Sequence, residues 1–298
     1  MATTLIEYVF KAMYDKHLFK QEDKYSLASM LGGKPFPISD LTGFDLKTPL
    51  AGGCPEGSPV GNATLDLTNI TFAGLKGFTG KHYKTTTQAD YTQFEVAINL
   101  TGSRVPAHPA DFSKGKVFME PSGKQVTNTE EGSPITGPLS LAGITDFPGL
   151  IIKGNFTAHQ GCSAGGAVNP SGKFIATVDT LALSLLFKLY IPADLKQPVS
   201  IVIPNFTVDP VSAEQITVTL LRSDGSLPDY NEDNLTEYEA INFWFAQNAI
   251  NFPPQGTPAL HTQIAEMIKT YLAPEGPLNT AIKGEIETNA NQFLKEHL

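Results

Sequence analysis

Between residues 181 and 191, apolar side chains occupy every second position of the chain. Alternate residues of an extended strand share one face of a sheet, so this spacing predicts a strand with a fully apolar face. The residues of that face are Leu181, Leu183, Leu185, Phe187, Leu189 and Ile191. The opposite face is mixed, because Leu186 and Tyr190 alternate there with small and charged residues. The apolar face has to be covered by helices, by a second sheet or by a bound apolar ligand.

Further strand patterns fill the middle of the chain. Leu65 and Leu67 alternate in one phase while Ile70 and Phe72 follow the other, which predicts a bulge near Asn69. Other strands are predicted at 94–100, 150–156, 174–191, 199–208 and 216–221. Strands that follow one another without helices between them are typical of antiparallel pairing.

Two Gly- and Pro-rich stretches interrupt this pattern. Residues 32–61 are predicted to form loops, and residues 102–138 a long excursion with at most a short hairpin.

Helical patterns occupy both ends of the chain. Thr4 and Glu7 form a capping-box signature for an amphipathic helix that ends near Phe19. Its apolar face is predicted to contain Leu5, Tyr8, Val9 and Met13, with Phe10 on the flank. Three more helices are predicted at 234–252, 258–271 and 277–298. This order, helices flanking a block of strands, indicates an α+β fold without βαβ units.

The net charge limits the kinds of binding partner that we expect. The formal net charge is -9 and no stretch is rich in Lys and Arg, which argues against binding to nucleic acid. No apolar run approaches the ~20 residues of a transmembrane helix. Because Glu7 and Asp15 interrupt the first twenty residues, we do not expect a signal peptide there. A cytoplasmic location is expected by default, with secretion by another route as the alternative.

Two further features of the sequence are its cysteines and its glycosylation motifs. Cys54 and Cys162 could pair with each other or be two separate thiols. Six asparagines begin Asn-x-Thr sequons for N-glycosylation: Asn62, Asn69, Asn99, Asn155, Asn205 and Asn234. The favoured interpretation is that Asn and Thr are simply abundant, since without a signal peptide the sequons would not meet the glycosylation machinery.

Catalytic chemistry has little support in the sequence. Residues 161–165 match the G-x-S-x-G pattern of serine hydrolases around Ser163, with His159 nearby. The Gly, Ala and Pro residues that follow do not begin a stable helix, so a glycine-rich hairpin or loop is favoured. The histidines are scattered without metal-ligand spacing. We therefore expect no catalytic residue, no metal site and no cofactor.

Several segments resemble the tubular lipid-binding (TULIP) superfamily, in particular takeout and juvenile-hormone-binding proteins and mite group 7 allergens. The resemblance lies in residues 65–78, in residues 150–156 with the strand that follows to Ile191, and in the helices at 4–19 and 277–297. It implies a strongly curved antiparallel sheet wrapped around a long helix, with lipids or other apolar ligands held in the tube between them. It also implies a single domain over residues 1–298, with insertions near 102–138 and 222–258.

Three functions follow from this resemblance and from the residues. The first is a binding or carrier protein for a hydrophobic small molecule or lipid. Its predicted ligand-facing residues are Leu181, Leu183, Leu185, Phe187 and Leu189, with Trp244 and Phe245 as a cap. The second is a non-enzymatic assembly protein with a filled tube, such as an accessory component of a toxin gene cluster, that binds a protein partner or a second copy of itself. The third is a hydrolase that uses Ser163.

Overall fold

The computed structural model describes most of the chain outside two long segments. The described residues are 2–20, 22–32, 34–45, 54, 59–101, 117–119, 125–127, 149–169, 171–178, 180–192, 198–212, 215–221, 223 and 259–297. Trp244, Phe245 and the helix predicted at 234–252 lie outside them, as do nearly all of the predicted insertions at 102–138 and 222–258.

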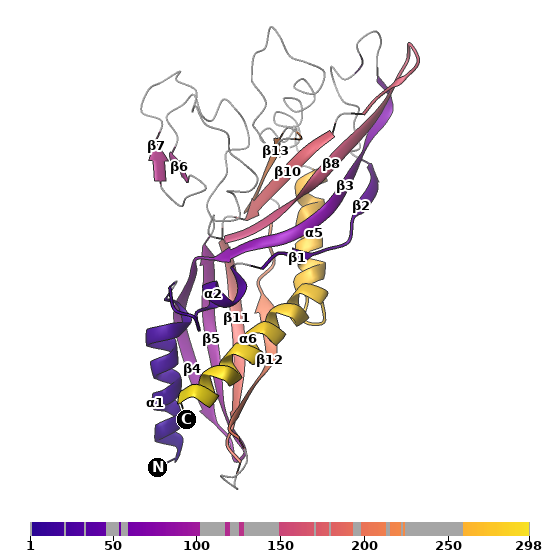
Figure 1. Cartoon of the computed structure of the whole chain (residues 1–298). Coiled ribbons are helices and arrows are strands. Elements are labelled where there is room, and N and C mark those ends of the chain that lie inside the picture. Colours follow the sequence, from indigo (N-terminus) through magenta and orange to yellow (C-terminus); the bar gives the residue numbers. More distant parts are fainter. Residues whose placement is uncertain are drawn as a thin grey trace.

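The described elements are helices at both ends and antiparallel strands between them (Figure 1). The helical elements are α1 (Ala2–Met13), the π-helical turn η1 (Tyr14–Leu18), α2 (Leu27–Leu31), α5 (Ala259–Leu272) and α6 (Pro277–His297). The long strands are β3 (Pro59–Lys76), β4 (Phe78–Thr87), β5 (Tyr91–Thr101), β8 (Gly149–Cys162), β10 (Ser171–Val178), β11 (Thr180–Tyr190), β12 (Ser200–Val208) and β13 (Ile216–Leu221). The short strands are β1 (Phe36–Pro37), β2 (Leu41–Asp45), β6 (Val117–Met119), β7 (Gln125–Thr127) and β9 (Ala167–Val168). This is the α+β class expected from the sequence.

The long strands form two sheets with matching order. One sheet, here called sheet A, has the path β3-β8-β10-β13, and the other, sheet B, has the order β4-β5-β11-β12. Each strand of sheet A is joined along the chain to the strand at the same place in sheet B: β3 to β4, β8 to β5, β10 to β11 and β13 to β12. The four connected pairs of strands therefore follow the same order in both sheets, as expected for one long antiparallel sheet.

In all four pairs, the strand of sheet A and the strand of sheet B meet at the same level of the molecule. At Gly77, between β3 and β4, the backbone has a φ of 83°, a conformation that glycine adopts readily. The backbone N–H of Thr101 donates to the carbonyl of Gly77, and that of Asp209 to the carbonyl of Ala182. Strand β5 ends at Thr101 and β8 begins at Gly149, both at this level, since Gly149 pairs with Lys76 of β3.

The predicted bulge in β3 is confirmed at Asn69. Its φ is 51°, and the pairing of β3 with β8 shifts between Thr68 and Thr71. Asn tolerates this left-handed conformation better than most residues, and its N–H donates to Asp40 Oδ1 over 2.8 Å. The extra residue explains why the two phases of β3 both turn toward the core: Leu67 and Ile70 are each buried.

The C-terminal helices lie against the two sheets. Helix α6 runs across sheet B beside β12, and its C-terminal end comes close to the helix α1 at the other end of the chain (Figure 1). Helix α5 reaches sheet A, where Tyr271 approaches Phe72 with ring centroids 6.0 Å apart. One side of α6 is apolar in sequence and buried in the structure: Leu278, Ile282, Ile286 and Phe293.

Two predictions from the sequence need correction. The stretch 32–61 is not only loop: it contains β1 and β2, and β3 begins at Pro59, because backbone pairing along β3 overrides the weak strand propensity of Gly and Pro. In α1, Tyr8 was expected on the apolar face but is 69% exposed, whereas Phe10, expected on the flank, is buried. The helix is therefore turned so that Phe10 and Met13 face the sheet.

Candidate functional site

The predicted ligand-facing residues of β11 all point into the molecule. Leu181, Leu183, Leu185, Phe187 and Leu189 of β11 are buried, while Leu186 and Tyr190 of the other face are only half-buried. The pairing of β11 with β5 places Phe187 opposite Phe94 and Leu185 opposite Val96. The predicted phase of this strand is therefore confirmed, and its apolar face belongs to the main core of the protein.

The core side of sheet B is packed with buried apolar side chains from the described strands and helices. A small apolar cavity of about 10 Å³ lies among them, roughly the space that a single water occupies. Its lining comes from α1, β5, β11, β12 and α6: Val9, Phe10, Met13, Phe94, Phe187, Leu189, Ile201, Phe293 and Leu294. Of the predicted ligand-facing residues, Phe187 and Leu189 line this cavity. A ligand larger than water needs one of these elements to move.

Helix α1 closes the cavity through apolar contacts. The ring of Phe10 stacks on Phe94 with centroids 3.7 Å apart and meets the edges of Tyr83 and Phe187 at 5.5 and 5.8 Å. Among the described side chains of α1, residues 7–13, the only ion pair runs along the helix from Lys11 to Asp15 in η1. No hydrogen bond of these side chains reaches the sheet. An open groove with mixed polar and apolar walls separates the outer side of α1 from β4, and Tyr8 and Tyr83 line it.

Helix α6 is held quite differently, by polar side chains that bond to the backbone of β12. Asn291 accepts a hydrogen bond from the N–H of Ile201 and donates one to its carbonyl, each over 2.8 Å. Glu287 accepts from the N–H of Ile203 over 2.9 Å. Asn279, which is fully buried, donates to the carbonyls of Phe206 (2.7 Å) and Leu272 (2.9 Å). Since β12 is the edge strand of sheet B, α6 takes the place of a further strand there.

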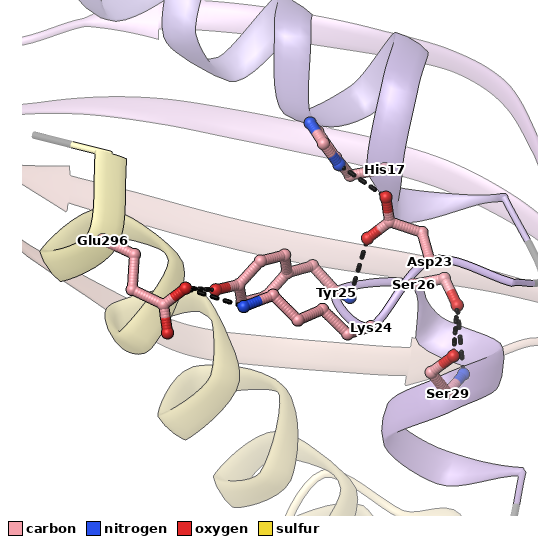
Figure 2. A network of polar contacts seen from close by, with 7 residues as sticks. All are labelled: His17, Asp23, Lys24, Tyr25, Ser26, Ser29 and Glu296. Atoms are coloured by element: carbon pink, nitrogen blue, oxygen red, sulfur yellow. Dashed lines mark hydrogen bonds and ion pairs between the residues drawn. The ribbon is translucent and has the colours of Figure 1, made fainter.

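A second polar network joins the segment after α1 to the end of α6 (Figure 2). His17 bonds through Nδ1 to Asp23 Oδ2 over 2.7 Å, and Asp23 Oδ1 accepts from the backbone N–H of Tyr25. Lys24 Nζ donates to Glu296 Oε2 over 2.7 Å, and the hydroxyl of Tyr25 donates to the same oxygen. Tyr25 also packs edge-on against Phe293 with centroids 5.0 Å apart. We call residues His17, Asp23, Lys24, Tyr25 and Glu296 the clasp.

The charges of the clasp are stabilised by their partners. The hydrogen bond from Lys24, together with those from Tyr25 and Gln292, lowers the pKa of Glu296 to about 2. Burial disfavours the ionised form of Asp23, but the hydrogen bonds from the Tyr25 N–H and from His17 outweigh it and lower its pKa. Both carboxylates are therefore ionised at neutral pH. The clasp fixes the chain just beyond α1 to the end of α6, whereas the described side chains of α1 itself meet the sheet through apolar contacts.

A third polar cluster lies on sheet A near Ser163. His159 bonds to Asn169 Oδ1 through Nδ1 (2.9 Å) and to Asp66 Oδ2 through Nε2 (3.0 Å). Both partners are oxygens, so both nitrogens donate only in the protonated ring, and the pKa of His159 is raised by Asn169 and Asp66. Ser163 lies in the exposed turn between β8 and β9, as the hairpin interpretation predicts. The partners of His159 are thus Asn169 and Asp66, not a serine hydroxyl.

The two cysteines form a disulfide between Cys54 and Cys162, with Cα atoms 5.6 Å apart and 108 residues apart in sequence. Within the described ranges, no group of three or more His, Cys, Asp or Glu side chains is arranged to hold a metal ion. The same part of the chain has no helix that combines the length and the apolar character needed to span a membrane.

Comparisons with known proteins add a structural likeness. No protein-family model matches the chain, and no curated protein matches it in sequence. Among solved structures, the crystal structure of Epiphyas postvittana Takeout 1 matches with 11% sequence identity and a TM-score of 0.33. The match covers 87% of this chain and 78% of that chain. Membership of the tubular lipid-binding superfamily stays a prediction.

Sequence reasoning found only part of the cavity lining. It did not select Phe10 or Met13 of α1, although both were noted as apolar, nor Phe94, Ile201, Phe293 and Leu294. Their alternation or helical spacing marks them as core residues, but pairing across the sheet decides which core residues meet at one place. Trp244 and Phe245, which were predicted to cap the ligand, lie outside the described residues.

Proposed function

We propose that the protein binds a hydrophobic small molecule or lipid between sheet B and the helices α1 and α6. We propose further that α1 moves aside to admit this ligand. The observation that carries this proposal is the contrast between the two helices over the sheet. Asn279, Glu287 and Asn291 tie α6 to β12 by hydrogen bonds, whereas the described side chains of α1 meet the sheet through apolar contacts such as Phe10 on Phe94.

The energies involved allow this exchange. Burying a Phe or Met side chain contributes roughly 1.5–3 kcal/mol, so releasing Phe10 and Met13 costs about 3–6 kcal/mol. A buried methylene contributes about 0.8 kcal/mol, so a ligand with roughly eight methylene groups in the vacated space offsets that cost. The walls left behind by α1, among them Phe94, Phe187 and Ile201, are apolar. Such a site suits an acyl or isoprenoid chain and needs no charged anchor.

The direct test is solvent extraction of natively purified full chain followed by mass spectrometry. A co-purified apolar molecule in a fixed molar ratio is the expected result. A fluorescent fatty acid then serves as the probe in titrations of the wild type, of Phe10→Ala and of Tyr8→Ala. Phe10→Ala weakens the closed state, so it should tighten the apparent affinity by roughly tenfold. Tyr8→Ala is the matched control, because Tyr8 is exposed on the same helix.

The wild type and the two variants together separate the parts of the proposal. Saturable probe binding that Phe10→Ala leaves unchanged would contradict the movement of α1 but not ligand binding itself. No extracted ligand, together with no probe binding by the wild type or by Phe10→Ala, would contradict ligand binding.

A second candidate is the non-enzymatic assembly protein with a filled tube. The observation in its favour is the small cavity, about 10 Å³, between sheet B and its helices. It is supported by an empty extract combined with an oligomer or a stable complex in native mass spectrometry. We propose no catalytic activity for either candidate.

A further inference from the structure

Every asparagine in the described strands begins an Asn-x-Thr sequon. These residues are Asn62 and Asn69 in β3, Asn99 in β5, Asn155 in β8 and Asn205 in β12. Asn is disfavoured in strands, so a simple abundance of Asn and Thr in a β-rich chain does not account for this placement. Asn169, which lies outside the strands, is followed by Pro170 and Ser171 and is therefore not a sequon.

The strand geometry puts each sequon on the outside of its sheet. In all five, the residue between Asn and Thr is buried: Ala63, Ile70, Leu100, Phe156 and Phe206. Because alternate residues of a strand share a face, the Asn and the Thr both lie on the side away from the core. Asn62, Asn69 and Asn205 are exposed, whereas Asn99 and Asn155 are half-buried.

The disulfide gives an independent indication of the compartment. Structural disulfides form in oxidising environments such as the secretory pathway and are rare in the cytosol. The bond between Cys54 and Cys162 links the segment before β3 to the end of β8. A chain that forms this bond passes through an oxidising environment, and the secretory pathway, where sequons are used, is such an environment; this departs from the cytoplasmic default expected from the sequence.

We propose that Asn62, Asn69 and Asn205 carry N-linked glycans. In the transfer, the side-chain nitrogen Nδ2 of each asparagine forms a bond to C1 of the first sugar of a lipid-diphosphate-linked oligosaccharide. The bond between C1 and the diphosphate oxygen breaks, the lipid diphosphate leaves with the bonding electron pair, and one amide proton is released. No oxidation or reduction takes place, and the oligosaccharide donor is the only co-reactant.

The positions of these glycans leave the interior of the protein clear. Asn205 in β12 is flanked by Phe206, whose buried side chain points to the core. Asn69 lies on the bulge of β3, where the left-handed backbone turns its side chain into solvent. Glycans on these residues extend away from the core under α1 and α6, so this inference does not depend on the proposed ligand.

The test is peptide mapping of the full chain isolated from its native source. Treatment with a peptide N-glycosidase in heavy-oxygen water converts each occupied Asn into a labelled Asp. Label is expected at Asn62, Asn69 and Asn205, with an intact mass above the 32.1 kDa of the polypeptide before treatment. Asn169 is the internal control, since it is exposed but precedes Pro170, and it should stay unlabelled.

A variant series checks one site in a eukaryotic secretory host, with a secretion signal added to the full chain. Thr71→Ser keeps the sequon of Asn69 and should keep its glycan, whereas Thr71→Ala should lose one glycan and nothing else. A native mass of 32.1 kDa without labelled Asp, or equal glycan numbers in Thr71→Ala and the wild type, would overturn the proposal.

Discussion

Asn291 of α6 bonds to both the N–H and the carbonyl of Ile201, as a neighbouring strand would. The Asn291→Leu variant removes both partners and leaves two backbone groups of β12 unsatisfied. We expect it to lower the free energy of unfolding by about 1–3 kcal/mol, as measured by urea denaturation. Asn289→Leu is the control, because its side chain bonds only within the helix, to the carbonyl of Glu285. Equal losses in the two variants would contradict the edge-strand role of Asn291.

The two faces of β11 should respond very differently to truncation. Leu185 is completely buried, so Leu185→Ala is expected to cost about 2–5 kcal/mol in urea denaturation. Leu186, the next residue, is only half-buried on the outer face, and Leu186→Ala should cost less than about 1.5 kcal/mol. A larger loss for Leu186→Ala would mean that the opposite face of β11 is the one against the core.

The pair Asp66–His159 should make stability depend on pH. The raised pKa of His159 adds stability below its ordinary value near 6.5, which is lost as the pH rises through the folded-state pKa. The backbone N–H of Gly43, with His159, lowers the pKa of Asp66, so its share exists above about 3.9 and is lost as the pH falls. The advantage of the wild type over His159→Gln should therefore be greatest between about pH 4 and 6.5.

The size of this effect is limited by exposure, since the side chains of His159 and Asp66 are 43% and 30% exposed. We expect a difference below about 1 kcal/mol, measured by urea denaturation at about pH 5.5 and about pH 8.5. An NMR titration that finds the pKa of His159 below 6.5 would contradict the geometry of the cluster.

The disulfide should stabilise the protein by restricting the unfolded chain. With the cysteines 108 residues apart in sequence, the chain-entropy account gives up to about 4–5 kcal/mol for the loss of the bond in the double variant Cys54→Ser/Cys162→Ser. Urea denaturation of the wild type with and without reductant should show a similar difference. Two reactive thiols in the denatured, unreduced wild type would exclude the bond.

Ser163 should have no role in ester hydrolysis. Because His159 bonds to Asn169 and Asp66, it is not positioned to activate the Ser163 hydroxyl. We expect Ser163→Ala to leave the rate of hydrolysis of a chromogenic ester unchanged. A wild-type activity that this variant abolishes, while Ser171→Ala retains it, would support the hydrolase instead.

The sequence predicted local structure more successfully than contacts between residues that are far apart in the chain. The period of two in β11 gave the correct inward face, and the change of phase around Asn69 gave the bulge, because both are properties of one strand. The rotation of α1 was wrong at Tyr8, since the choice between two nearly apolar sides of a short helix depends on what lies opposite. Here the ring of Phe94 selects Phe10.

The candidate site depended on contacts that no short window contains. The cavity joins Phe10, Phe94, Phe187 and Phe293, which are brought together only by strand order and by the path of α6. The polar residues of α6 were equally hidden: Asn291 and Glu287 look like ordinary surface positions of a helix. Their function requires the backbone of β12 beside them.

The level at which the strands of sheet A meet those of sheet B is the same in all four pairs, and this has an evolutionary consequence. Strand pairing in sheet A and in sheet B is complete on either side of that level, so the chain between β5 and β8 can lengthen or shorten without shifting either register. Descendants of such a protein can therefore acquire new surface segments at this seam while the two paired halves keep their geometry.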